Sequence, residues 1–383
     1  MESSINETDT MNTNQPTGNR GLNLVKIRYW SWGLILLIVV MSILIRIRLL
    51  EVPLDRDTGE YAYAAQLMLE GRPPYALLYN MKMPGIYAAY ALIFACLGQT
   101  LNSVHLGLAV VNAATILLIF LLAKKLLGHR TAVATAAVFA LLSLGQQVRG
   151  TFAKAEHFVI FFAIAGILLL IESVERKKRL RLFAGAVLLG LAFGMKQHGF
   201  AFIVFAGLYL LGCGLRRRPF IFRCFLIDCL VFLAGVLLPF AATCQILWWC
   251  GVFDKFWFWT FDYATKYASA LPVSIGWHIL WRRIIGITSS AVVLWLAGGV
   301  GVVALIWNRK AHRHTLFLLG FLLFSFLAVC PGFYINVGVI DIYPDHTVYR
   351  WNEEAAGYEP RSKDRIFVFE RKASIYQDFT GKP

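Results

Sequence analysis

The chain has 383 residues, of which 58% are hydrophobic and 15% are charged, and its net charge is +15. Soluble domains are about half apolar and about a quarter charged, so this composition excludes a soluble enzyme and a disordered chain. Most apolar residues come in blocks of roughly 17–22 residues, long enough to cross a bilayer core of ~30 Å, and they do not alternate as in an outer-membrane barrel. The sequence therefore predicts an all-α polytopic membrane protein.

The predicted elements begin with a polar, disordered cytoplasmic tail at 1–28 and an uncleaved membrane anchor at 29–47. The next apolar block, 84–97, is too short to span and predicts an interfacial helix within an outer loop, 48–102. Eight further spans are predicted, at 103–123, 131–147, 157–173, 182–194, 200–214, 225–249, 286–307 and 315–333. The transmembrane domain then covers residues 29–333, and residues 334–383 form a polar extracytoplasmic tail.

Basic clusters between the apolar blocks predict the orientation. With nine spans, the clusters that start at Lys124, Arg176, Arg216 and Arg309 all lie on the side of the N-terminus, which the positive-inside rule assigns to the cytoplasm. The positive charge therefore needs no nucleic acid as a partner. We expect a multi-pass protein of the cell inner (plasma) membrane, with its N-terminus in the cytoplasm and its C-terminus outside. The seven cysteines lie in or beside apolar blocks without metal spacing, so we expect them to be buried apolar residues.

The outer loops carry acids and bases together, whereas the cytoplasmic loops are almost purely basic. A mixed cluster of charges at a membrane surface is what chemistry on an anionic substrate needs. The first outer loop contains Asp57 and Tyr61 at the start of a helical pattern, which places Asp57 at or near the helix N-cap. By itself this pattern also fits an amphipathic surface helix with a capping acid. The segment Asn80-Met81-Lys82-Met83-Pro84-Gly85 follows, directly before the short apolar helix.

This succession of parts resembles the first periplasmic loop of the GT-C membrane glycosyltransferases, in the bacterial branch akin to protein O-mannosyltransferases and aminoarabinose transferase. The resemblance covers roughly residues 30–333 as architecture and is specific mainly in residues 55–98. It implies a GT-C-like helix bundle with juxtamembrane helices, in which Asp57 is the acid of the loop and Lys82 belongs to its Lys-Pro segment. Thr58 stands where the family usually has a second acid, so only Asp57 is carried over.

The second outer loop contains Arg149, Lys154 and Glu156, and Glu156 matches a second acidic position of the family. A glutamate at a membrane edge favours a functional role because its burial is costly. The alternative is an ion pair between Glu156 and Lys154 or Arg149, and the two roles are compatible.

Two further sites complete the candidate set. Lys196 and His198 lie on the outward turn after 182–194, where the lysine either binds phosphate or is a solvated turn residue, and His198 could act as an acid or a base. Arg282 and Arg283 precede a span, so they either extend to lipid headgroups or bind a phosphate.

The resemblance implies an inverting glycosyltransferase that moves a sugar from a polyprenyl-phosphate-linked donor to a hydroxyl of a lipid, glycan or protein acceptor on the extracytoplasmic face. Asp57 is the expected general base and Glu156 the supporting catalytic residue. The expected substrate-binding residues are Tyr61, Lys82, Arg149, Lys196, His198, Arg282 and Arg283. No nucleotide-binding or zinc motif is present, so no cofactor is assigned, although the resemblance allows a divalent metal.

Two other interpretations stay open at this point. One is a membrane transporter or lipid-binding protein without chemistry, although no inverted repeat is visible. The other is a degenerate, shortened glycosyltransferase paralogue. It arises because the segment 330–334 and the strand-like segment 365–370 stand closer together here than in the family.

Overall fold

The computed structural model describes residues 17–78, 80–145, 148–265, 273–289, 291–307, 312–335, 349–352 and 357–360. Helices account for nearly all of them, and the strands among them are β1 (Tyr349–Asn352) and β2 (Gly357–Pro360), which pair antiparallel. The prediction of an all-α polytopic membrane protein is confirmed. The first 16 residues and the strand-like segment 365–370 lie outside the described residues.

Helices occupy the predicted membrane blocks in order. They are α1 (Thr17–Ile47), α4 (Leu101–Leu127), α5 (His129–Leu142), α6 (Ala155–Arg176), α7 (Arg179–Met195), α8 (Phe200–Leu215), α9 (Phe222–Trp249), α13 (Val292–Trp307) and α14 (His312–Ile335). The helix α1 begins at Thr17, so helical structure extends into the segment 1–28 that the sequence assigned to a tail.

The shorter elements lie between these helices. They are α2 (Arg56–Leu69), α3 (Pro84–Leu97), the 3-10 turn η1 (Gln197–Gly199), α10 (Phe253–Trp257), the π-helical turn η2 (Phe258–Tyr263) and α12 (Val273–Ser289). The block 84–97, expected as an interfacial helix, forms α3 with Pro84 at its first position, where the missing N–H costs nothing.

Five helices of the described part are long and apolar enough to cross a membrane: α1 from Tyr29 onward, α4, α6, α8 with the turn before it, and α9. The helix α5, with 14 residues, and α7, with 17, are shorter, so the total of nine spans stays a prediction. The expected span 286–307 is not one straight helix. Its two parts, Leu280–Ser289 and Val292–Trp307, meet at 107°.

Close helix packing in the centre of the bundle depends on small residues. A side chain at Gly166 of α6 would meet the Gly185 carbonyl oxygen of α7 at 2.8 Å. A side chain at Gly185 would meet the Gly166 carbonyl oxygen at 2.9 Å. Helices in a lipid environment associate through such close contacts because apolar burial alone gives no advantage there. This contact holds α6 and α7 together, and the loops before α6 and after α7 carry candidate site residues.

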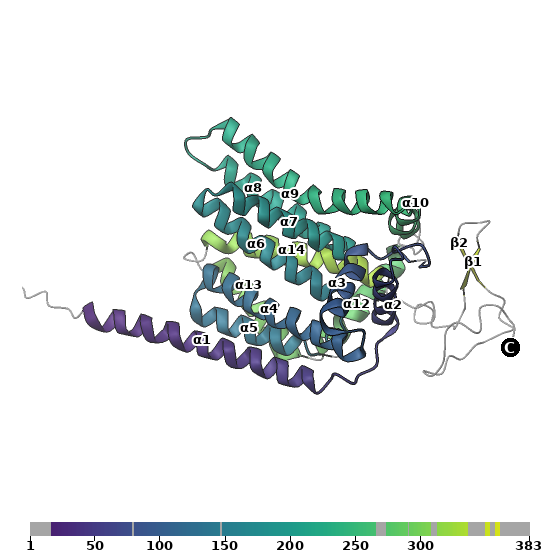
Figure 1. The fold of residues 1–383 in the computed structure, drawn as a ribbon. Coiled ribbons are helices and arrows are strands. Elements are labelled where there is room, and N and C mark those ends of the chain that lie inside the picture. The colour runs from purple at the N-terminus through teal and green to yellow at the C-terminus, as the bar shows by residue number, and fades with distance from the viewer. Residues whose placement is uncertain are drawn as a thin grey trace, which may run out of the picture.

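The two ends of the bundle differ in what they carry. Figure 1 shows α2, α3, α10 and α12 together at one end. The turns that follow α4, α6 and α8 lie at the opposite end, and they contain the basic clusters at 124–125, 176–181 and 216–218. The mixed acids and bases of the loops around α2, α3 and α6 are therefore gathered at one end of the molecule.

Candidate functional site

The N-terminus of α2 presents two aspartates to this end of the bundle. Asp55 is the N-cap residue, because its carboxylate accepts a hydrogen bond of 3.0 Å from the Thr58 backbone N–H. Asp57, expected at or near the cap, lies two residues after it. Asp57 lies in the first turn, where the helix dipole favours a negative charge, and it makes no cap hydrogen bond.

One lysine joins the two aspartates. The Lys154 ammonium lies 2.7 Å from an Asp55 oxygen and 2.9 Å from an Asp57 oxygen. The side chains of Lys154 and Asp57 are only 13% and 14% exposed, so the contact is shielded from water. The exposed arginines Arg56 and Arg149 lie farther from these acids, at 3.4 Å from Asp57 and 4.0 Å from Asp55. Lys154 is thus the main counter-charge of both acids.

Lys82 reaches the same aspartate from the segment before α3. Its ammonium lies 3.8 Å from the other oxygen of Asp57. The Lys82 carbonyl accepts a hydrogen bond of 2.5 Å from the buried Tyr75 hydroxyl, and the Met81 carbonyl accepts one of 2.9 Å from Gln197. These backbone contacts fix the segment, so the ammonium of Lys82 is held beside the carboxylate of Asp57.

Glu156 and Lys196 form the second ion pair of this end. Their side-chain atoms lie 2.6 Å apart, so the partner of Glu156 is Lys196 and neither Lys154 nor Arg149. Glu156 lies in the first turn of α6, and Lys196 directly follows α7. His198, in η1, is within electrostatic range of both residues and of Lys82. The structure thus brings the predicted site residues Lys82, Glu156, Lys196 and His198 into one cluster, in which Lys82 lies beside Asp57.

The charges at this end shift one another's protonation. Burial alone would raise the pKa of the Asp57 carboxyl, but the ammonium groups of Lys82 and Lys154 outweigh it and hold that pKa well below its ordinary value. Burial lowers the pKa of Lys82, and the attraction of Asp57 offsets this only in part. For Lys154 the hydrogen bonds to Asp55 and Asp57 prevail over burial and raise the pKa. Asp57 is therefore ionised at neutral pH.

Glu60 is a buried acid one turn after Asp57. Its carboxylate accepts hydrogen bonds from the Tyr87 hydroxyl at 2.9 Å and from the Asn80 amide. Burial raises the pKa of Glu60, although these donors and Lys82 act in the opposite direction. Glu60 thus connects α2 to α3 and to the segment that carries Lys82.

Three predicted substrate-binding residues, Tyr61, Arg282 and Arg283, lie on helices of the same end but take no part in these ion pairs among the described contacts. Tyr61 is 2% exposed, and its ring packs against Tyr87 and Tyr90 at 6.1 and 5.5 Å, so its position fits a packing role and not the expected substrate contact. Arg282 and Arg283 lie on α12, which packs against α14. Arg282 is exposed and has no ion pair with the acids at α2 among the described residues.

Three residues of this site were not predicted from the sequence: Asp55, Glu60 and Lys154. The signal for Glu60 was its spacing of three residues from Asp57, which puts both acids on one side of a helix. Lys154 was considered only as a partner of Glu156. Nothing local in the sequence indicates that it reaches a loop about a hundred residues earlier.

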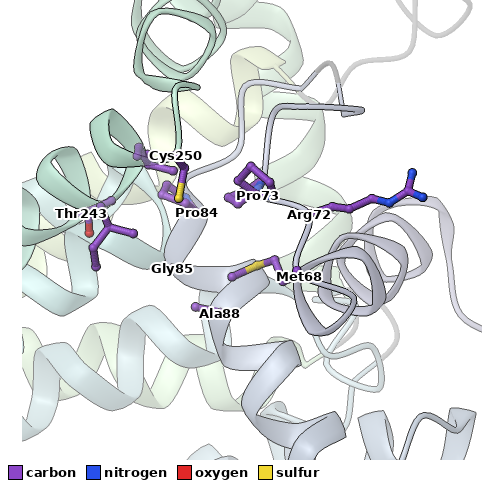
Figure 2. A pocket seen from close by; sticks show the side chains of 12 residues that line it. Met68, Arg72, Pro73, Pro84, Gly85, Ala88, Thr243 and Cys250 are labelled. Atoms are coloured by element: carbon purple, nitrogen blue, oxygen red, sulfur yellow. The ribbon is translucent and has the colours of Figure 1, made fainter.

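An apolar cleft of about 320 Å³ opens next to the segment that carries Lys82 (Figure 2). It lies between the α2–α3 connection and the end of α9, and the Arg72 side chain extends away from it. Its lining residues are Met68, Gly71, Arg72, Pro73, Pro74, Pro84, Gly85, Ala88, Thr243, Ile246, Leu247 and Cys250. Pro84 is two residues after Lys82, so the cleft begins close to the charged residues.

Metal binding is not supported by the described part of the chain, since no group of three His, Cys, Asp or Glu side chains there could hold a metal ion. Asp55 and Asp57 share the ammonium of Lys154. The described residues therefore do not fit the divalent metal that the resemblance allows.

Comparisons with known proteins agree with the architecture. No curated protein sequence and no solved structure matches the chain. The family model described as dolichyl-phosphate-mannose-protein mannosyltransferase matches residues 81–249, less than half of the chain. The matched region includes Lys82, Lys154, Glu156 and Lys196, whereas Asp57 lies before it. Over this region the chain is similar to that mannosyltransferase family, and together with the multi-pass helical fold the similarity indicates a membrane glycosyltransferase.

Proposed function

We propose that the chain transfers a sugar from a polyprenyl-phosphate-linked donor to an acceptor hydroxyl on the extracytoplasmic face of the membrane, with inversion at the anomeric carbon. The observation that carries this proposal is the position of Asp57, a shielded carboxylate 3.8 Å from the ammonium of Lys82. A group that can accept a proton and a group that can bind a phosphate thus lie side by side at the same end of the bundle.

The donor fits this arrangement in two parts. Its phosphate binds Lys82, and Lys196 lies close enough to add a second positive charge, since the two ammonium groups influence each other electrostatically. The prenyl chain enters the apolar cleft, which begins two residues from Lys82 at Pro84. A lipid carrier suits such a site because its tail stays in the bilayer while its sugar is presented at the surface.

In the reaction, Asp57 accepts the proton of the acceptor hydroxyl while the hydroxyl oxygen attacks the anomeric carbon from the face opposite the phosphate. The bond between the anomeric carbon and the phosphate oxygen breaks, and the lysines stabilise the departing phosphate. Glu156 supports this step by holding Lys196 in place through their ion pair.

The low pKa of Asp57 is compatible with this role because the donor itself changes it. In the free site, Lys82 and Lys154 hold the carboxyl ionised but weakly basic. A phosphate at Lys82 adds negative charge beside Asp57 and engages one of its two counter-charges, which raises the pKa of the carboxyl. Asp57 then becomes a stronger base only when the donor is present.

A transfer assay with the purified protein in detergent tests the proposal. Polyprenyl-phosphate hexoses are offered with a panel of hydroxyl acceptors to the wild type, to Asp57→Asn and to the control Asp228→Asn. Asp228 is also ion-paired but lies at the opposite end of the bundle, with Arg179 and Arg217. We expect transfer to fall about 10²–10⁴-fold in Asp57→Asn, the range for loss of a general base, and to stay near the wild-type rate in the control. A folded Asp57→Asn protein with wild-type transfer contradicts the assignment of the base.

A further inference from the structure

Arg46, near the end of α1, is a buried cation that no acid compensates. Its side chain is 4% exposed, and no carboxylate lies within 4.0 Å of it in the described part of the chain. A buried charge without a counter-ion is costly unless hydrogen bonds satisfy it. Arg48, two residues later, is exposed, as expected of a basic residue at the end of a membrane helix. The burial of Arg46 therefore needs a specific reason.

The guanidinium of Arg46 is used to hold the segment between α5 and α6. It donates to the Ser143 carbonyl at 2.9 Å and to the Gly150 carbonyl at 3.1 Å. These two carbonyls flank the turn, and the Gly150 N–H closes it by donating to the Gly145 carbonyl at 3.1 Å. A side chain at Gly150 would lie 2.0 Å from the Ser143 oxygen, so the turn closes this tightly only with glycine. Arg46 thus fastens both sides of a tight turn.

The same segment ends at Lys154. The Ala153 carbonyl accepts a hydrogen bond of 2.6 Å from the buried Tyr90 hydroxyl, and the next residue places its ammonium between Asp55 and Asp57. The segment is therefore held at Ser143 and Gly150 by α1 and at Ala153 by α3. These restraints from two other helices add to the hydrogen bonds within the segment, and the side chain that follows it, Lys154, lies between the acids at the start of α2.

We propose that Arg46 is a positioning residue for Lys154: by holding the carbonyls of Ser143 and Gly150, it sets the Lys154 ammonium between Asp55 and Asp57. The effect of Arg46 on sugar transfer rests on the proposed function, whereas its effect on the position of Lys154 does not. Its donors are directed at the Ser143 and Gly150 carbonyls and, more weakly, at the Ser143 hydroxyl at 3.5 Å, so the residue acts through the segment and touches no substrate.

Trace acetylation of the purified full-length protein with acetic anhydride tests the placement without any substrate. Mass spectrometry reports how fast each lysine reacts in the wild type, Arg46→Met, Arg46→Lys and the matched control Arg48→Met.

In Arg46→Met we expect Lys154 to leave its two acids, so it should react several-fold faster than in the wild type. Arg46→Lys can reach only one of the two carbonyls and should show a smaller increase. Arg48→Met should not change Lys154, and Lys125, at the other end of the bundle, should not change in any variant.

An unchanged rate at Lys154 in a folded Arg46→Met protein overturns the proposal. If that variant does not fold, Arg46→Lys decides in its place, and a wild-type rate at Lys154 in that variant overturns the proposal equally.

The pH profile of transfer tests the consequence for the site. Removing Lys154 takes away a positive charge that lowers the pKa of Asp57, so the acidic fall of kcat/KM should move to higher pH in Lys154→Met. Arg46→Met should shift it in the same direction, and the double variant should shift it no further than Lys154→Met alone. Additive shifts, or none in Arg46→Met, contradict the positioning role. A wild-type protein that transfers no sugar contradicts the proposed function, while acetylation of Lys154 still decides the role of Arg46.

Discussion

Both ends of the helix bundle contain ion pairs, and they differ in exposure and in how the partners are shared. At the basic end, Lys125 contacts Glu175 at 2.5 Å, and Arg179 contacts Asp228 at 2.9 Å. Water reaches these pairs, since Glu175 is 45% exposed and Arg179 is 47% exposed. At the opposite end, Asp57 and Lys154 are both less than 15% exposed. The pair of Asp57 and Lys154 is therefore more shielded than the pairs of the basic end, although Glu156 in the neighbouring pair is 47% exposed.

The two ends also differ in which charged residue is shared between two partners. At the basic end, Asp228 contacts two arginines, so positive charge is in excess there. At the other end, Lys154 serves two aspartates at once, and the shielded contacts shift the pKa of Asp57. Exposed ion pairs contribute about 0–1 kcal/mol, so those of the basic end need no role beyond orientation in the membrane. The shielded, shared charges are the ones suited to chemistry.

The largest expected effect concerns which end faces outward. In a background without the seven native cysteines, Tyr63→Cys and Val148→Cys, both at exposed positions, should react completely with a membrane-impermeant thiol reagent added to intact cells. Lys178→Cys and Arg216→Cys, at exposed positions of the basic end, should react only after permeabilisation. Labelling of residue 178 from outside would reverse the two ends and remove the extracytoplasmic site.

The second largest expected difference between the two ends is in the affinity for the donor. Lys82→Ala should weaken the binding of undecaprenyl-phosphate-mannose by about 1–3 kcal/mol, the range for a lost charge-assisted hydrogen bond. Lys82→Arg should restore only part of the affinity, because a planar guanidinium does not reproduce a compact ammonium. Lys125→Ala at the basic end serves as the control and should bind normally. Equal affinity of Lys82→Ala and wild type, measured by titration calorimetry, would remove Lys82 from the phosphate site.

A smaller effect is expected for Glu156→Gln. Glu156 orients Lys196 in the proposed mechanism, so its loss should reduce transfer about tenfold, equivalent to ~1.4 kcal/mol of barrier, and less than the loss of Asp57. The reduction should appear mainly as a higher KM for the donor. Glu175→Gln, which breaks the comparable pair with Lys125, should have no effect. If Glu156→Gln matches Asp57→Asn in severity, Glu156 has a direct catalytic role.

The smallest effect concerns stability and pH at Glu60. Its pKa is raised in the folded protein, so the folded state binds the proton more tightly than the unfolded state does. The contribution of Glu60 to stability is therefore full below the ordinary glutamate pKa and is lost as pH rises through the raised value. A glutamine cannot ionise, so the Glu60→Gln variant should not show this loss of stability as pH rises. Thermal unfolding of the purified protein across pH 4.5 to 8 measures it, with the exposed Glu70→Gln as a control that keeps the wild-type slope.

Much of this fold could be predicted because apolar length and basic clusters are local properties of the sequence. The blocks at 84–97 and 225–249 correspond to α3 and α9 within a few residues. The bend at α12–α13 could not be foreseen, since the apolar run 286–307 looks continuous in sequence. For the site, Asp57, Lys82, Glu156 and Lys196 followed from the family resemblance. Their pairing did not, because it depends on how distant loops fold back.

The positions of Asp55, Asp57 and their partner lysines along the chain determine the order in which these residues can meet during synthesis. Asp55 and Asp57 leave the ribosome before Lys154, and Lys154 before Lys196, so the site is composed in a fixed order. Until α6 and α7 have entered the membrane and packed through Gly166 and Gly185, the acids lack their lysine and Glu156 lacks its partner. A chain inserted only as far as α5 therefore lacks these ion pairs. The charged cluster is completed when α7 has been inserted and Lys196 meets Glu156, before α8 to α14 follow.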